Sequence, residues 1–169
     1  ATNTARRSVR VASGTLDAVD PPTAVYRDGA GAYQARELGS SAVHALAYTA
    51  PADVPDLPEV GLSPGAVLFA ATTRSAKGRP GTGYLDVVPT SGGAPLVVRT
   101  PVNRLVTATI RAGEVLYVTA SPTRLSLCVR TLTDWANPTC RSVKAPGKTD
   151  ERDAWVSSVG DALRAGLAL

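Results

Sequence analysis

The chain has 169 residues, with 18 basic and 14 acidic side chains, one histidine, two cysteines and no methionine. With 44% apolar but only 5% aromatic residues, it can bury the core of one domain spanning residues 1–169, built mainly from Val, Leu and Ala. It contains no apolar run of about 18 residues, the length that spans a bilayer, so we expect no membrane partner, and the composition excludes a fibrous or disordered chain.

Short stretches of alternating apolar and polar residues predict a series of strands between about residues 5 and 144. The strands expected in the first third of the chain are residues 8–12, 23–27, 32–38 and 42–49, with a turn at Asp28-Gly29. Those expected later are residues 66–73, 83–88, 95–99, 105–111, 114–120 and 124–132, followed by a short run at 140–144.

A proline-rich segment separates these two groups of strands. Residues 50–65 contain four prolines interleaved with Asp53, Asp56 and Glu59. Proline cannot donate a hydrogen bond to a neighbouring strand, so this segment is predicted to be a long acidic surface loop. The spacing of its three acids matches no calcium-binding loop, and we interpret them as solvated.

The last long strand predicts how the sheet is covered. In residues 124–132, Leu125, Leu127 and Val129 fall on one face, whereas Arg124, Ser126, Cys128 and Arg130 fall on the other. This alternation is typical of an antiparallel sheet with one face on the core and one in water.

The C-terminal segment changes period. Residues 149–153 combine a capping threonine with acids, and Trp155, Val159 and Leu163 then recur at helical spacing, which predicts an amphipathic helix over about 149–168. Glycines at 160 and 166 weaken this helix, so it should pack against its own sheet or a second subunit. The predicted class is therefore α+β, a mainly antiparallel sheet with one covered face and a C-terminal helix.

The two cysteines flank a predicted turn near Asp134. If a hairpin is centred there, Cys128 and Cys140 face each other and can form a disulfide. The alternative is two free thiols that act as small apolar side chains. A disulfide would favour a secreted protein or an extracellular particle, whereas free thiols would leave the compartment open.

The basic residues concentrate in the middle of the chain. Residues 67–148 carry a net charge of +8, and the remainder therefore carries −4. Such a segment suits a polyanionic partner, of which nucleic acid is the commonest, although a solvated basic face remains the alternative.

The sequence offers few groups for chemistry. His44 is the only histidine and lies in an extended apolar run without a nucleophile motif, so we interpret it as structural or surface-exposed. Two cysteines without clustered histidines do not make a zinc site. We therefore expect no enzyme activity, no metal, no cofactor and no small-molecule substrate.

Two stretches resemble the coat proteins of single-stranded RNA bacteriophages. The first resembles that family's early order of strand, turn, strand, serine-rich turn and strand, and the second its first C-terminal helix. These stretches are residues 23–29 continuing through Tyr33-Gln34 and Leu38 to 40–45, and residues 149–156 with Ala162-Leu163.

The resemblance implies a virion protein that dimerises and assembles into an icosahedral shell around single-stranded RNA. Each helix would lie across the partner's sheet, so Trp155, Val159 and Leu163 should contact another subunit. Arginines on the opposite face would contact RNA, and those expected to alternate out of the sheet are Arg99, Arg111, Arg124 and Arg130.

A second interpretation is a secreted bacterial β-sandwich or jelly-roll binding module without catalytic activity, whose signal peptide has been removed. The number of predicted strands and the spacing of their turns favour it. A micrograph of the expressed protein separates the two interpretations, because only the coat protein forms particles.

Overall fold

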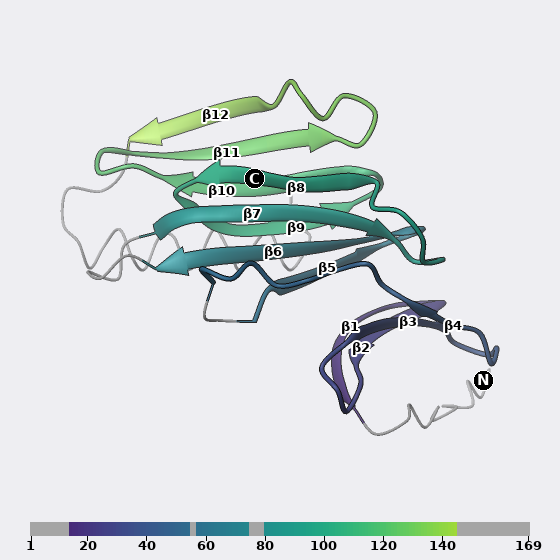
Figure 1. Ribbon diagram of the computed structural model, residues 1–169. Coiled ribbons are helices and arrows are strands. Elements are labelled where there is room, and N and C mark those ends of the chain that lie inside the picture. Colours follow the sequence, from purple (N-terminus) through teal and green to yellow (C-terminus); the bar gives the residue numbers. More distant parts are fainter. Residues whose placement is uncertain (1–13, 55–56, 75–79, 145–169) are drawn as a thin grey trace, which may run out of the picture.

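The computed structural model describes residues 14–54, 57–74 and 80–144, and this part of the chain is entirely β-structure (Figure 1). Its strands form three antiparallel sheets of four strands each. The expectation of an α+β fold is therefore wrong for the described residues. The predicted helix at 149–168, with Trp155, Val159 and Leu163, lies outside them, as does the expected strand at 8–12.

The strands follow the chain in three consecutive groups. Sheet A contains β1 (Thr15–Asp20), β2 (Thr23–Arg27), β3 (Tyr33–Glu37) and β4 (Val43–Ala45). Sheet B contains β5 (Glu59–Ser63), β6 (Ala66–Arg74), β7 (Pro80–Pro89) and β8 (Val97–Asn103). Sheet C contains β9 (Leu105–Arg111), β10 (Glu114–Ala120), β11 (Arg124–Thr131) and β12 (Thr139–Lys144), with β12 and β9 at its two edges. Every pairing joins strands that are adjacent in sequence, so each sheet is a simple meander.

Sheet B lies between two apolar cores. The apolar run at the start of β6 is uninterrupted, and residues 66–71 are all at most 4% exposed. Leu68 and Ala70 pack with Ile110 and Tyr117 of sheet C, whereas Val67 and Phe69 pack with residues of sheet A and the loop after it. An unbroken apolar strand is typical of one buried on both faces, and β6 is such a strand.

Sheet C is also covered on both faces, which overturns the expectation of a single covered face. Cys128 belongs to the core shared with sheet B, while Leu125 and Val118 are buried in a separate cluster on the opposite face. The predicted alternation along this strand is present, because Leu125 and Cys128 do lie on different faces. The prediction was wrong because it exposed the face that carries Cys128 to solvent, whereas this face packs against sheet B.

Some expected strands coincide with the observed ones and others do not. β2, β9 and β10 have the predicted bounds, and the side chain of Asp28 closes the turn after β2 by accepting hydrogen bonds from the amides of Ala30 and Ala32 at 2.9 and 3.0 Å. The hairpin between β9 and β10 turns through Ala112 and Gly113, both with positive φ, as a type I′ turn requires.

The predicted loop at 50–65 is wrong in its second half. Strand β5 lies there and pairs with β6, because the prolines fall on either side of Glu59–Ser63 rather than within it. Glu59 is not a solvated loop acid. Its carboxylate accepts hydrogen bonds from the Thr107 hydroxyl at 2.7 Å and the Ala108 amide at 3.3 Å, which joins β5 to β9.

Candidate nucleic-acid interface

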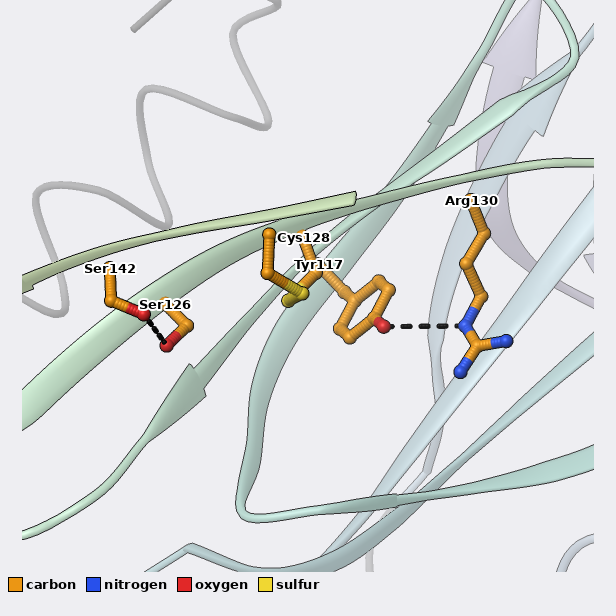
Figure 2. The surroundings of a disulfide bond; sticks show 6 residues. Tyr117, Ser126, Cys128, Arg130 and Ser142 are labelled. Atoms are coloured by element: carbon orange, nitrogen blue, oxygen red, sulfur yellow. Dashed lines mark hydrogen bonds between the residues drawn. A yellow bond between two sulfur atoms is a disulfide. The ribbon is translucent and has the colours of Figure 1, made fainter. Parts of the chain in front are cut away.

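The four arginines expected to contact RNA do not form one surface. Arg130 is held on the face of β11 that points toward sheet B. Its guanidinium donates to the Tyr117 hydroxyl at 3.3 Å (Figure 2). It also donates to the Trp135 carbonyl and lies 5.4 to 5.9 Å from the centroids of the Tyr117 and Trp135 rings. Two aromatic rings and two acceptors of the protein itself contact this cation, so Arg130 contributes to the packing between β10, β11 and the segment after β11.

Arg99 is also bound within the protein. Its Nε donates to Asp86 at 3.3 Å, another of its nitrogens donates to the Thr49 carbonyl, and the guanidinium lies 5.8 Å from the Tyr84 ring centroid. Burial raises the pKa of Asp86, and the positive charge of Arg99 partly offsets this effect. Arg99 therefore compensates a buried carboxylate at the side of sheet B nearest sheet A.

The remaining two arginines are exposed but distant from each other. Arg111 ends β9 at the β9–β10 hairpin, and Arg124 begins β11 at the β10–β11 turn. The length of β10 separates these turns, a distance of about 20 Å for seven residues of extended chain. A single phosphate contact surface does not include both.

Another set of cations lies along the edge of sheet C. Lys144 lies directly opposite Arg124 across the β11–β12 pair. Arg141, three residues earlier on β12, lies opposite Leu127 and therefore points to the other face of the sheet. Neither β11 nor β12 contains an acid, and every residue of β12 is exposed. We call Arg124, Arg141 and Lys144 the basic rim.

The disulfide fixes the register of this rim. Of the two alternatives for the cysteines, the structure contains the disulfide Cys128–Cys140, with an S–S distance of 2.02 Å, and both cysteines face each other across β11 and β12. The hydroxyls of Ser126 and Ser142 meet two residues further along, 2.7 Å apart (Figure 2). The bridge therefore holds β12 covalently in the register that places Lys144 beside Arg124.

Sequence reasoning did not select Arg141 and Lys144, although a signal was present. A hairpin that brings Cys128 opposite Cys140 necessarily brings residue 124 opposite 144, since the two numbers in each antiparallel pair add to the same total. The pairing of the cysteines therefore implies the pairing of Arg124 with Lys144, although this step was not taken from the sequence.

A cluster of three aromatic side chains lies between sheets A and B. Tyr33, Tyr48 and Phe69 stack and meet edge to face, with centroids 4.1 to 5.5 Å apart. Within the described residues, the hydroxyls of Tyr33 and Tyr48 are buried and have no hydrogen-bond partner. Burial, reinforced by the nearby Asp86, raises the pKa of Tyr48 to about 12.

These unpartnered hydroxyls predict that Tyr48→Phe stabilises the protein. A buried hydroxyl without a partner costs about 1 kcal/mol or more, and phenylalanine preserves the ring stacking. The wild type should also lose stability as the pH rises through 10 to 12, because ionisation of Tyr48 is easier in the unfolded chain, and the variant should lose less. Urea unfolding at pH 7 and pH 11 measures both effects; a variant less stable than the wild type at pH 7 contradicts the assignment.

Other groups offer little chemistry in the described part of the chain. His44 lies exposed on the edge strand β4. Among residues 14–54, 57–74 and 80–144, no three His, Cys, Asp or Glu side chains gather as a metal site would require. In the same ranges, no helix is long and apolar enough to cross a bilayer.

No protein-family model, curated protein or solved structure matches this chain.

Proposed function

We propose that the protein is a structural coat protein that assembles with copies of itself and binds single-stranded RNA through the basic rim. The observation that carries this proposal is the pairing of two exposed cations, Arg124 and Lys144, on two strands that contain no acid. Like charges directly opposite each other in a sheet are unfavourable. An anion that contacts both would remove this repulsion, and a phosphate backbone supplies anions at regular spacing.

The sequence resemblance supports the same proposal. The stretch similar to RNA bacteriophage coat proteins, residues 23–45, corresponds to β2, β3 and β4 of sheet A, in the order strand, turn, strand, turn, strand. The second stretch lies outside the described residues. We assign the phosphate contacts to the basic rim at the edge of sheet C and not to either stretch of the resemblance.

The proposal is tested by expressing the protein and examining it by electron microscopy and by size-exclusion chromatography over a range of salt concentrations. We expect closed particles that contain nuclease-protected RNA. A monomer without RNA at every salt concentration would overturn the proposal.

The contribution of the basic rim is tested by the double variant Arg124→Ala/Lys144→Ala. We expect weaker RNA binding and a smaller salt dependence, with the slope of log affinity against log salt reduced by about 0.7 for each lost phosphate contact. Filter binding of a single-stranded RNA at several salt concentrations measures this slope. The matched control is Arg104→Ala, an exposed arginine between β8 and β9; equal slopes for the rim variant and the wild type would refute the role of the rim.

A second candidate function is favoured by the disulfide. A secreted, non-catalytic β-sandwich binding module would use stacked antiparallel sheets and an oxidised cysteine pair, as sheets B and C do. The same experiments separate it from the coat protein, since the module would stay monomeric and carry no RNA.

A further inference from the structure

One edge strand of sheet A and one edge strand of sheet C carry opposite charges. In the described residues, the edges of sheet A are β1 and β4 and those of sheet C are β12 and β9, so β1 and β12 each have no hydrogen-bonded strand on one side. β1 has the sequence TLDAVD and β12 the sequence TCRSVK. Unpaired edges of this kind accept a further strand by backbone hydrogen bonds.

The charges match at the ends of the two strands when these are aligned in parallel. Each strand has six residues, and β1 has acids at its third and sixth positions, where β12 has cations. A β-bulge at Asp17 interrupts β1, so the alignment applies to its regular part, residues 18–20, and places Asp20 beside Lys144. Aligned in antiparallel over their full length, the same strands place both acids opposite hydroxyl residues.

Both edges also expose apolar side chains. Leu16 and Val19 of β1 are 57% and 49% exposed, and Val143 of β12 is 51% exposed. In the parallel alignment Val19 lies beside Val143. The pairing would therefore bury apolar area as well as match charges.

We infer that the protein assembles head to tail, with β1 of one copy adding as a parallel strand to β12 of the next. In Figure 1 these strands lie at separate places on the protein, β1 at the lower right and β12 at the top. Each copy therefore presents both halves of the contact. Such a heterologous contact generates a ring when the rotation closes and an open filament when it does not. The inference rests on the proposed self-assembly and identifies its contact.

The Asp20–Lys144 pair provides the clearest test, because Asp17 already binds Arg27 of its own chain at 3.1 Å. In Asp20→Lys two cations face each other at the contact while the basic rim is intact. In Lys144→Asp, which also removes a cation of the basic rim, two acids face each other. We expect each variant to assemble about tenfold more weakly than the wild type, since like charges at an interface oppose association. An equal mixture should assemble again, because each variant then supplies the partner that the other requires.

Matched controls carry the same charge changes away from both edges. Glu114→Lys lies on β10 within sheet C, and Arg104→Asp lies between β8 and β9. Neither should alter assembly. Light scattering of each variant, of the mixture and of the double variant Asp20→Lys/Lys144→Asp gives the mass in each case. A charge change that merely damaged the fold would not be rescued by mixing.

Cross-linking tests the register. Copies carrying Val19→Cys mixed with copies carrying Val143→Cys should form an intermolecular disulfide in the parallel alignment, whereas Leu16→Cys with Val143→Cys should do so in the antiparallel one. Cross-linking of the second pair alone would overturn the parallel register.

Particles that form unchanged in both charge variants would overturn the contact but leave the coat function standing. A wild type that is monomeric would overturn both, and assembly without RNA would overturn only the RNA-binding function.

Discussion

Replacing Phe69 with alanine is expected to lower the free energy of unfolding by about 3 to 5 kcal/mol. The ring is 0% exposed, stacks on Tyr48 with centroids 4.1 Å apart, and meets the edge of Tyr33 at 4.7 Å. It joins sheet B to sheet A and to the loop after it. Its loss would leave a cavity that β6 cannot fill, because the neighbouring side chains of β6 face the other core. Urea denaturation measures the change.

The matched control for Phe69→Ala is Val98→Ala on β8. Val98 is 75% exposed, so its replacement should alter stability by no more than about 0.5 kcal/mol. A loss below 1 kcal/mol for Phe69→Ala, which is well under the usual cost of deleting a buried ring, would mean that the aromatic cluster does not join the two sheets as described.

Removing the disulfide has the second large expected effect. The double variant Cys128→Ala/Cys140→Ala should be less stable by about 3 kcal/mol, because the bridge closes a loop with a sequence separation of 12 and restricts the unfolded chain accordingly. Cys128 is also buried in the core between sheets B and C, so part of the loss would come from packing. Thermal or urea unfolding with and without a reducing agent measures the effect.

The reducing agent provides the control for this variant. It should destabilise the wild type by a similar amount and leave the alanine variant unchanged. If complete reduction left the free energy of unfolding of the wild type unchanged, the disulfide would not be what holds β12 against β11. The same reduction should weaken RNA binding if the register of the basic rim matters.

The sequence was sufficient to locate most of the strands, but it did not predict β1 or β5 and did not give the number of sheets. β2, β9 and β10 are bounded by turn residues and alternate regularly, and these local signals determine their limits. β5 has no comparable signal, because its five residues lie among prolines and it exists by pairing with β6. The number of layers depends on long-range packing. The unbroken apolar run of β6 is a local signal of a strand covered on both faces, but it was not used in the prediction, which assumed one covered face.

The candidate site was predicted only in part for a similar reason. The alternation of β11 correctly separated Leu125 from Arg130, yet it did not reveal that Tyr117 and Trp135 surround Arg130. Trp135 comes from the segment between β11 and β12, whose path no periodicity describes. In contrast, the cysteine pairing contained enough information to align Arg124 with Lys144.

The position of β6 between two cores has a consequence for how this protein can diverge. A substitution on β6 alters one core and leaves the other intact, because adjacent residues such as Val67 and Leu68 belong to different clusters. An insertion or deletion of one residue would exchange the two sets of side chains across the whole strand and disrupt both cores at once. Relatives of this protein are therefore expected to vary in the composition of β6 far more readily than in its length.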